Sequence, residues 1–414
     1  MKILFLVHRS WPYHGGSERY VLEHAVAASE WGHDATICTT DAWDMSVFAG
    51  RRGKRISKRS DVYKGVGIIR FPVVNPPGAR IARAVLRRLL PCGKDRFYYP
   101  NPFVPSLERW LTRDRGFHVV HANAMPFMLY NGWMHARRFG RMLVTVPHTN
   151  VGERYRRVDA LRYFDGCQPG IFRKSNFVVV QNSHEREIYE GLGVPGERIH
   201  LSGSGVDPGE FQEADASAAR RRHGLEGPVV LCMTAHSADR GVVYILDAFK
   251  SLIRRGMNAT LVLAGPILPD ARKVLDSRAG EDEELAGRLV VTGYVTNEER
   301  VDLLAASDVV LLPSRLDAFG IVVIEAWISG KPVVGCWSGA MPDLVRDGEN
   351  GFLVSFGDAA TLAHRIGLLL GNRELASEMG ERGRKTVLAN WTWNKVTDRF
   401  YRRLAQCSLG RLEP

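Results

Sequence analysis

Short apolar runs alternate with longer amphipathic stretches along most of the 414-residue chain. The apolar runs have the length of buried strands, whereas the stretches between them place apolar residues every three or four positions, as amphipathic helices do. The predicted strands are residues 2–7, 34–40, 67–73, 118–123, 142–148, 177–183, 228–234, 259–265, 288–294, 309–314, 331–336 and 351–356. The clearest predicted helices are residues 17–32, 242–256, 298–307, 361–371 and 391–407. Strands that alternate with helices predict parallel sheets built from βαβ units.

The same alternation occurs in both halves of the chain, with no repeat of short period. We therefore predict an α/β protein of two Rossmann-like domains whose parallel sheets face each other across a cleft. The first domain is residues 1–205 and the second is residues 206–390. A C-terminal helix within residues 391–414 is predicted to cross back to the first domain. Sheets of this kind bind ligands at the carboxyl ends of their strands, so the cleft is the expected site.

The composition is that of an ordinary globular protein, with 45% hydrophobic and 24% charged residues. The opening MKILFLV is too short for the apolar core of a signal peptide and is interpreted as a first buried strand. No stretch approaches the roughly 18 to 20 apolar residues of a membrane-spanning helix. The 6 cysteines are far apart and lack metal-ligand spacing, which favours reduced thiols and a cytoplasmic location.

Positive charge is concentrated in the first half of the chain. Residues 1–205 hold 31 Lys and Arg against 17 Asp and Glu, whereas residues 206–414 hold 25 against 28, so the net charge of +11 divides into +14 and −3. Such asymmetry indicates an anionic partner, which could be nucleic acid, an anionic lipid surface or an acidic substrate.

Two basic stretches carry much of this charge. Residues 51–59 read RRGKRISKR, and residues 79–90 read ARIARAVLRRLL, with apolar and basic residues on different faces of a predicted helix. A basic amphipathic helix suits peripheral binding to an anionic membrane surface. The alternative is a solvated loop followed by an ordinary packed surface helix. Nucleic-acid binding is the weaker interpretation, because neither stretch has interleaved aromatic residues.

One acidic residue stands in an unusual place. Glu325 lies within IVVIEAW, a run that is apolar on every side, just after Asp317 and the dipeptide Phe319-Gly320. An ionised carboxylate buried in such a helix costs several kcal/mol unless a partner accepts it. The sequence therefore predicts a partner for Glu325, which could be a bound ligand or an arginine of the same domain.

Several motifs occur in a fixed order along nearly the whole chain, about residues 1 to 400. They are His14-Gly15-Gly16-Ser17-Glu18, Val119-Val120-His121, Thr145-Val146-Pro147-His148, Gly205-Val206-Asp207, Gly293-Tyr294-Val295, Leu312-Pro313-Ser314, Asp317-Ala318-Phe319-Gly320, Glu325-Ala326, Gly330-Lys331-Pro332-Val333-Val334 and Asn350-Gly351-Phe352-Leu353-Val354. In this order and spacing the chain resembles the retaining glycosyltransferases of family four, which have the GT-B fold. The block 313–335 is the most specific part of the resemblance, and the single dipeptides gain weight from their order.

The resemblance implies a role for each residue of that block. In the family the first acid, here Asp317, contacts the sugar near the reacting carbon, and the second, here Glu325, bonds the ribose hydroxyls of the nucleotide. Asp317 replaces the usual Glu and is one methylene shorter. The backbone at Phe319, Gly320 and Ile321 would position the sugar, with the start of the helix favouring a phosphate or a sugar oxygen. Tyr294 and Val295 are expected near the base.

Other donor-binding residues are implied outside the block. Gly15 and Gly16 would let the loop lie against the diphosphate, with Ser17 capping the helix that follows; the alternative is an ordinary glycine loop. Arg240 stands where the family usually has Lys and could hold the diphosphate bidentately; the alternative is a solvated residue at a helix start. Five residues earlier the family has an Arg and this chain has Ala235. His236 or Arg315 could substitute for it.

His148 ends a predicted strand of the first domain where the family has a His that contacts the donor sugar and shapes the reaction centre. The alternative is a histidine satisfied within the core. No Cys/His cluster has zinc spacing, and the acidic run at 281–284 does not follow a strand. We therefore expect no metal and no cofactor, because basic side chains and helix termini can neutralise the leaving diphosphate.

The sequence thus predicts a cytoplasmic hexosyltransferase that could bind peripherally to the cytoplasmic face of a membrane. It would move a sugar from a nucleotide-sugar to a carbohydrate or lipid-linked acceptor held mainly by the first domain, with retention at the anomeric carbon and Asp317 and His148 as catalytic residues. Because Ala235 replaces an Arg, the alternative is a catalytically weak GT-B subunit that binds nucleotide-sugar or assists a partner enzyme. A nucleic-acid-binding protein is a third, weaker hypothesis.

Overall fold

The computed structural model describes residues 1–13, 15–75, 102–124, 128–149 and 168–409. The described residues form two compact units. The first unit contains the described residues from Met1 to Thr149, from Gln168 to Ser202 and from Thr397 to Leu409. The second unit is Gly203–Val396. The final helix, α17 (Trp393–Leu409), therefore begins in the second unit and belongs to the first from Thr397 onward.

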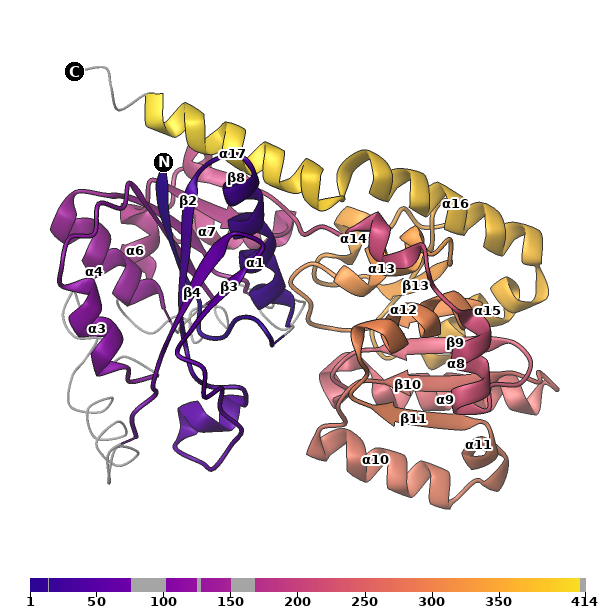
Figure 1. Ribbon diagram of the computed structural model, residues 1–414. Coiled ribbons are helices and arrows are strands. Elements are labelled where there is room, and N and C mark those ends of the chain that lie inside the picture. The colour runs from indigo at the N-terminus through magenta and orange to yellow at the C-terminus, as the bar shows by residue number, and fades with distance from the viewer. Residues whose placement is uncertain (14, 76–101, 125–127, 150–167, 410–414) are drawn as a thin grey trace. The chain divides into compact units, whose positions relative to one another are not determined.

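The first unit is built on an eight-stranded sheet with the order β3-β4-β2-β1-β5-β6-β7-β8. Its strands pair in parallel except for β3, which is antiparallel to β4. The strands are β1 (Lys2–Leu6), β2 (Asp34–Thr40), β3 (Ser60–Tyr63), β4 (Val66–Phe71), β5 (Val119–Asn123), β6 (Met142–Val146), β7 (Phe177–Val180) and β8 (Ile199–Leu201). The helices are α1 (Gly16–Glu30), η1 (Met45–Ala49), α3 (Pro105–Leu111), α4 (Leu129–Phe139), α6 (Gln168–Lys174), α7 (Ser183–Gly191) and η3 (Gly196–Arg198). Helices α3, α4 and α6 cover one face of the sheet, and α1 with α17 covers the other (Figure 1).

The second unit is built on a six-stranded parallel sheet with the order β11-β10-β9-β12-β13-β14. Its strands are β9 (Val229–Met233), β10 (Thr260–Ala264), β11 (Leu289–Gly293), β12 (Val309–Leu312), β13 (Val333–Cys336) and β14 (Phe352–Val354). Its helices are η4 (Pro208–Phe211), α8 (Ala216–His223), η5 (Ala238–Arg240), α9 (Val242–Arg254), α10 (Pro269–Gly280), α11 (Glu283–Gly287), α12 (Asn297–Ala306), α13 (Ile321–Ile328), α14 (Met341–Leu344), α15 (Ala359–Gly371) and α16 (Arg373–Asn390).

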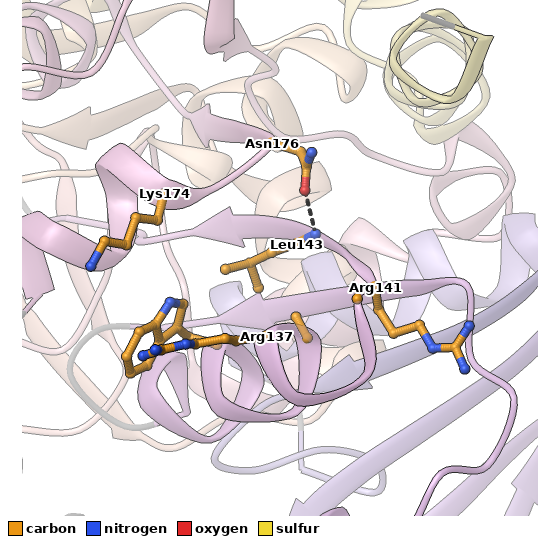
Figure 2. Close-up of a pocket in the computed structure, with 8 residues that line it drawn as sticks. Arg137, Arg141, Leu143, Lys174 and Asn176 are labelled. Carbon is orange, nitrogen blue, oxygen red and sulfur yellow. Dashed lines mark hydrogen bonds between the residues drawn. The ribbon is translucent and has the colours of Figure 1, made fainter. Parts of the chain in front are cut away.

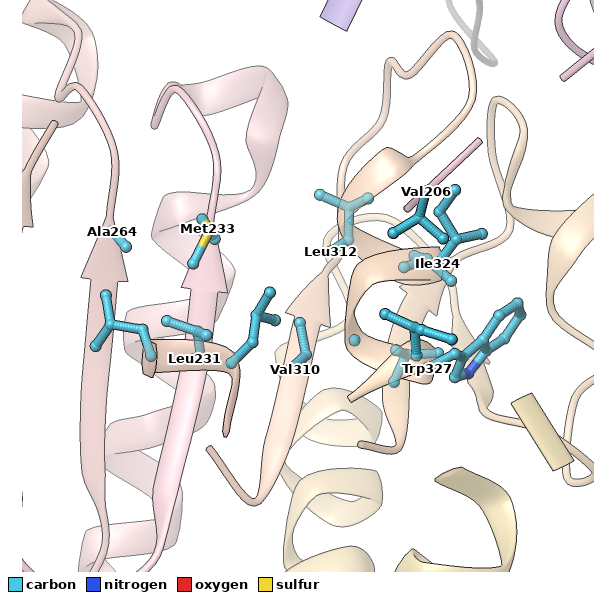
Figure 3. Packing of buried hydrophobic residues seen from close by; sticks show 14 of the residues in the cluster. Val206, Leu231, Met233, Ala264, Val310, Leu312, Ile324 and Trp327 are labelled. Carbon is cyan, nitrogen blue, oxygen red and sulfur yellow. The ribbon is translucent and has the colours of Figure 1, made fainter. Parts of the chain in front are cut away.

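The strands of the second sheet are apolar on both sides because helices cover both faces. In β9, Leu231 and Met233 join the core beneath α13, whereas Val230 and Cys232 join the core beneath α9 and α15. This alternation follows from the period of two along a strand. Figure 3 shows the first of these cores, with Trp327 of α13 packed beside the sheet. Strands buried on both faces read as continuous apolar runs, which is why the sequence located them.

The structure confirms the predicted fold class of two parallel-sheet α/β domains. All twelve predicted strands are found. Three end at the predicted residue, and the other nine end one to three residues earlier, because the apolar run continues into the loop at the carboxyl edge. Two short strands, β3 and β8, were missed. In the described part of the chain, no helix is both long and apolar enough to cross a membrane.

Histidine side chains form part of the core of the first unit. The ring of His121, on β5, lies 4.9 Å from the ring of Phe5 and 5.2 Å from that of Phe400 on α17. His24 on α1 stacks near it, at 6.0 Å between ring centroids. Burial lowers the pKa of His121 to about 3 and that of His24 well below its ordinary value. These histidines are therefore neutral core residues.

We expect the stability of the first unit to fall on acidification, in part because of His121. The unfolded chain takes up a proton near the ordinary pKa of 6.5, whereas folded His121 does so only near 3. Acidification through this window therefore favours unfolding, and His121 alone contributes about 2 kcal/mol of lost stability between pH 7 and pH 5. Between pH 7 and pH 5, the free energy of unfolding should therefore fall by about 2 kcal/mol less in the variant His121→Phe than in wild type. Urea unfolding at both pH values measures this difference. The exposed His364→Asn should behave like wild type, and an equal loss in His121→Phe and wild type would contradict the assignment.

Candidate active site

The loop after β12 leads directly into the N-terminus of α13. Gly320 precedes the helix with a left-handed φ of 87°, and a Cβ there would lie 2.2 Å from Cε of Met341. Only glycine satisfies both constraints, so the chain can turn sharply from the strand into the helix. The first amide groups of α13 and its dipole make this end of the helix favourable for a phosphate or a sugar oxygen.

Asp317 and Arg240 meet beside this helix start. They form a close ion pair, and Oδ1 of Asp317 also accepts a hydrogen bond of 3.0 Å from the backbone N–H of Phe319. The two residues follow β12 and β9, which are neighbours in the sheet, so the loops after these strands end side by side. Both side chains remain partly accessible, at 15% for Asp317 and 24% for Arg240. The structure therefore brings together the residues predicted to contact the sugar and the diphosphate.

Glu325 has a protein partner, which is the alternative that the sequence left open. Its Oε1 lies 2.5 Å from a guanidinium nitrogen of Arg300 on α12, and Arg300 also pairs with Glu210 at 2.9 Å. The side chain of Glu325 is 5% exposed and that of Arg300 is 12% exposed. The buried side chain of Glu325, the fifth residue of α13, is thereby paired with a guanidinium of the neighbouring helix α12.

Neither candidate substitute for the missing Arg at position 235 is suited to that role. His236 is buried, its Nε2 lies 3.1 Å from the carbonyl oxygen of Ala264, and burial lowers its pKa to about 4, so it is neutral at pH 7. Arg315 forms an ion pair with Asp239 and lies 5.0 Å from the ring centroid of Phe356. Among the cations considered for the diphosphate, only Arg240 lies beside Asp317.

The remaining predicted donor contacts also lie at the carboxyl ends of the second sheet. Tyr294 follows β11 and is 65% exposed, whereas Val295 packs partly against the core. Phe319 is buried, with its ring 5.1 Å from that of Trp391, and Ile321 opens α13. Tyr294 thus offers an accessible aromatic surface, while Phe319 and Ile321 contribute mainly packing and backbone groups.

In the first unit, the glycine loop is shaped by a buried carboxylate. Glu18, in the first turn of α1, lies 3.1 Å from Nε2 of His8 and 2.9 Å from a guanidinium nitrogen of Arg9. Burial opposes its ionisation, but His8 and Arg9 outweigh that effect and hold the pKa of Glu18 well below its usual range. A Cβ at Gly15 would lie 2.3 Å from Oε2 of Glu18, so Gly15 is required by this close approach.

The expected capping of α1 by Ser17 is wrong. Gly15 occupies the N-cap position without a side-chain cap, Gly16 is the first helical residue, and Oγ of Ser17 donates to Glu18 at 2.9 Å. Glycine reaches the N-cap conformation as easily as serine does, and the Ser17 hydroxyl is engaged by the carboxylate that controls the loop.

His148 follows β6 and has a left-handed backbone, with φ of 52°. Its ring packs edge-on against that of Tyr20 on α1, at 5.0 Å between centroids. Burial lowers its pKa to about 4, although the nearby Glu18 acts in the opposite direction. His148 is therefore neutral at pH 7. The structure places it near the start of α1, so the residues predicted in the first domain also form one group.

A depression of about 630 Å³ lies elsewhere in the first unit. It is lined in part by Arg137, Arg141 and Lys174 (Figure 2), and also by Trp133. It lies at the amino ends of β6 and β7, opposite the edge that holds His148. Two of its cations stand in the last turns of α4 and α6, where they offset the negative ends of these helices. Its charge therefore has a structural explanation, and it is not part of the candidate active site.

Two family models match the chain, one over most of the first unit and one over most of the second. The model described as "Glycosyltransferase Family 4" matches residues 14–210, and "Glycosyl transferases group 1" matches residues 215–386. The chain is 33% identical over 329 residues to the GDP-mannose-dependent alpha-(1-6)-phosphatidylinositol monomannoside mannosyltransferase of Mycolicibacterium smegmatis, covering 76% of this chain and 82% of that protein. The chain belongs to glycosyltransferase family 4. It is also 27% identical to the MMP alpha-(1->4)-mannosyltransferase of Mycolicibacterium hassiacum, over 96% of each protein.

The structure of this glycosyltransferase is similar to that of Anabaena HepE, solved in complex with UDP and glucose. The TM-score is 0.73 at 18% identity, covering 98% of this chain and 100% of HepE, so the likeness supports the GT-B fold. The predicted family, fold and enzyme class are thereby confirmed. Among the described residues, no group of three or more His, Cys, Asp or Glu side chains is arranged to hold a metal ion.

No role was assigned from the sequence to three charged residues that shape the candidate site. They are Glu18, Arg300 and Glu185, the last a buried carboxylate on α7. A local signal existed for Glu185, because it stands three residues after Asn182 in the pattern of a helix cap. No local pattern links Arg300 to a carboxylate 25 residues further along the chain.

Proposed function

We propose that this glycosyltransferase is a retaining, metal-independent enzyme that transfers a hexose from a nucleotide-sugar to a carbohydrate or lipid-linked acceptor. The observation that supports it most is the turn into α13, where the partly accessible Asp317 and Arg240 lie beside a helix N-terminus. An acid and a cation at an anion-favouring helix start suit a sugar diphosphate. Retention is implied by the family resemblance.

In the proposed reaction, the acceptor hydroxyl oxygen bonds to the anomeric carbon on the face from which the diphosphate leaves. The bond between this carbon and the diphosphate oxygen breaks, its electron pair stays with the diphosphate, and the hydroxyl proton passes to a diphosphate oxygen. Arg240 and the first amides of α13 would stabilise the negative charge that develops, as preorganised groups that need no reorganisation in the transition state. This charge stabilisation is the proposed reason that no metal is required.

The other residues would hold the donor in place. We assign Asp317, His148 and the backbone of 319–321 to the sugar, Gly15 and Gly16 to the diphosphate, Glu325 to the ribose, and Tyr294 with Val295 to the base. Because burial lowers the pKa of His148 to about 4, it would offer the sugar a hydrogen bond and no charge.

Turnover of a donor panel tests the proposed function. UDP-, GDP- and dTDP-sugars would be screened by thermal shift, because a ligand that binds only the folded state raises its melting temperature. The relatives suggest starting with GDP-mannose, which one of them is named for, and with UDP-glucose. Each stabilising donor would then be assayed for transfer and hydrolysis with EDTA present, with product configuration read by proton NMR. An inverted product, or activity lost with EDTA, would contradict retention or metal independence respectively.

The chain also has a feature that favours a catalytically weak subunit. Ala235 removes one cation from the expected diphosphate clamp, His236 is neutral, and Arg315 is paired with Asp239. A weak subunit would bind a nucleotide-sugar and raise the melting temperature without turning it over. Transfer or hydrolysis by the isolated chain would exclude this alternative.

We further propose that the basic segment 51–59 binds anionic membrane surfaces and brings the enzyme to a membrane-proximal acceptor. Arg51, Arg52 and Arg59 are exposed. Arg55, in contrast, pairs with Asp41 at 2.9 Å. The second basic stretch, residues 79–90, lies outside the described residues.

We expect weak, reversible binding to anionic vesicles that falls as salt rises, because salt screens exposed charges. Replacing Arg51, Arg52 and Arg59 by Gln should weaken binding at least tenfold at low salt, given about 1 kcal/mol for each cation near the surface. A control with the same charge change is Arg373, Arg384 and Lys385 to Gln on the exposed part of α16. Sedimentation with anionic and neutral vesicles at two salt concentrations measures both. A wild-type protein that stays in the supernatant at low salt would refute membrane binding.

A further inference from the structure

Glu185 joins the ends of two adjacent strands of the first unit. Its Oε1 accepts a hydrogen bond of 2.8 Å from the backbone N–H of Thr149, which follows β6, and its Oε2 accepts one of 2.6 Å from the N–H of Gln181, which follows β7. The residue lies in the first turn of α7, where Asn182 caps the helix by accepting from the N–H of Glu185 at 2.7 Å. The cap thus fixes the backbone from which the carboxylate reaches both loops.

Only a carboxylate suits this position. Two backbone N–H groups donate to separate oxygens, and an ionised Glu is the side chain of this length that accepts at both ends; a Gln would turn its own NH₂ toward one of the donors. The carboxylate is fully buried, and among the described residues no Lys, Arg or His forms an ion pair with it. Burial raises its pKa to about 7, so Glu185 is mainly ionised only above pH 7 and its charge is costly to bury. The donors that favour the ionised form are the two loop amides and the side chain of Thr149, so two of the three interactions come from the residue after His148.

One of the two clamped amides belongs to the residue after His148. His148 has a left-handed backbone, which an L side chain rarely adopts and which persists only when its surroundings fix it. Thr149 is fixed twice, because its Oγ1 also lies 2.9 Å from the hydroxyl of Tyr189 on α7. Helix α7 therefore holds the backbone on the C-terminal side of His148, while Tyr20 packs against its ring.

We propose that Glu185 is a positioning residue for His148: by clamping the backbone at Thr149 it holds the imidazole in the orientation used during sugar transfer. The inference rests on the proposed function and deepens it, because it assigns a residue that acts through His148 without contacting substrate. It predicts that Glu185 affects turnover only while His148 is present.

A double-mutant cycle tests this coupling. We expect Glu185→Gln to lower kcat at least tenfold at pH 8.5, with the nucleotide Kd unchanged within twofold, because the predicted nucleotide contacts are mainly in the second unit. In a His148→Ala background, Glu185→Gln should change kcat by less than twofold. Glu108→Gln, which alters another partly buried carboxylate of the first unit, should leave kcat as in wild type. Glu185→Asp, too short to reach both amides, replaces Glu185→Gln in the cycle should that variant not fold.

A second measurement is independent of turnover. Hydrogen exchange at the amide of Thr149 should be at least tenfold faster in Glu185→Ala than in wild type, since this variant removes the hydrogen-bond acceptor of that amide. Full kcat in the folded variant, or losses that multiply in the double variant, would overturn the positioning role. A wild-type enzyme that turns over no donor would instead overturn the proposed function, and an unchanged exchange rate at Thr149 would then still refute the clamp.

Discussion

Replacing Asp317 by Asn is expected to lower kcat by at least tenfold, while the nucleotide Kd changes little. The carboxylate holds Arg240 and the backbone N–H of Phe319 at the start of α13, where the proposed reaction develops negative charge. Asn keeps the shape and loses the charge, so Arg240 is no longer held by an ionic partner. An interaction used mainly in the transition state appears in kcat and not in ground-state binding.

His148→Ala is expected to lower kcat by at least tenfold as well, again with little change in nucleotide affinity. Steady-state kinetics with the best donor gives kcat for both variants, and calorimetric titration with the free nucleotide gives Kd. A matched control is Asp247→Asn, whose carboxylate pairs with Arg278 at 3.1 Å on the outside of the second unit. A folded variant at position 317 or 148 that keeps full kcat would remove the catalytic role of that residue.

The second large effect is expected at Glu325, where nucleotide affinity should suffer more than turnover. Hydrogen bonds to a charged acceptor contribute about 1.5–3 kcal/mol each, so loss of the ribose contacts in Glu325→Ala should weaken the nucleotide Kd by roughly tenfold or more. Ribose contacts exist before and after the transition state, so kcat for bound donor should fall less.

The ion pair with Arg300 requires a control, because Glu325 also has a structural role. Removing one partner of a buried ion pair costs about 3–5 kcal/mol of folding stability. The loss in Glu325→Ala should be smaller, because Arg300 keeps Glu210 as a second partner. Glu325→Gln keeps an acceptor for Arg300 and should be closer to wild type in melting temperature. If Glu325→Ala lowers the melting temperature while the nucleotide Kd stays at the wild-type value, Glu325 serves the ion pair alone and the ribose assignment is lost.

The sequence by itself determined the fold class, the succession of most strands and helices along the chain, and the turn at the start of α13. These features are local: a strand buried on both faces is a continuous apolar run, an amphipathic helix repeats every three or four residues, and Gly320 is needed wherever the chain turns with positive φ. Strands β3 and β8 were not predicted, because these short strands lie at the two edges of the sheet and have too few buried residues to form an apolar pattern in the sequence.

Only the tertiary structure decided which charges meet. Asp317 pairs with Arg240, 77 residues away, because β9 and β12 are neighbours in the sheet although β10 and β11 separate them in the chain. Glu325 pairs with Arg300 because α12 and α13 pack on the same face. Glu185 reaches Thr149 because β6 and β7 end side by side. Periodicity indicates which face of a helix or strand is buried. The partner of each charged side chain depends instead on the order of strands in the sheet and on helix packing, which the whole chain determines.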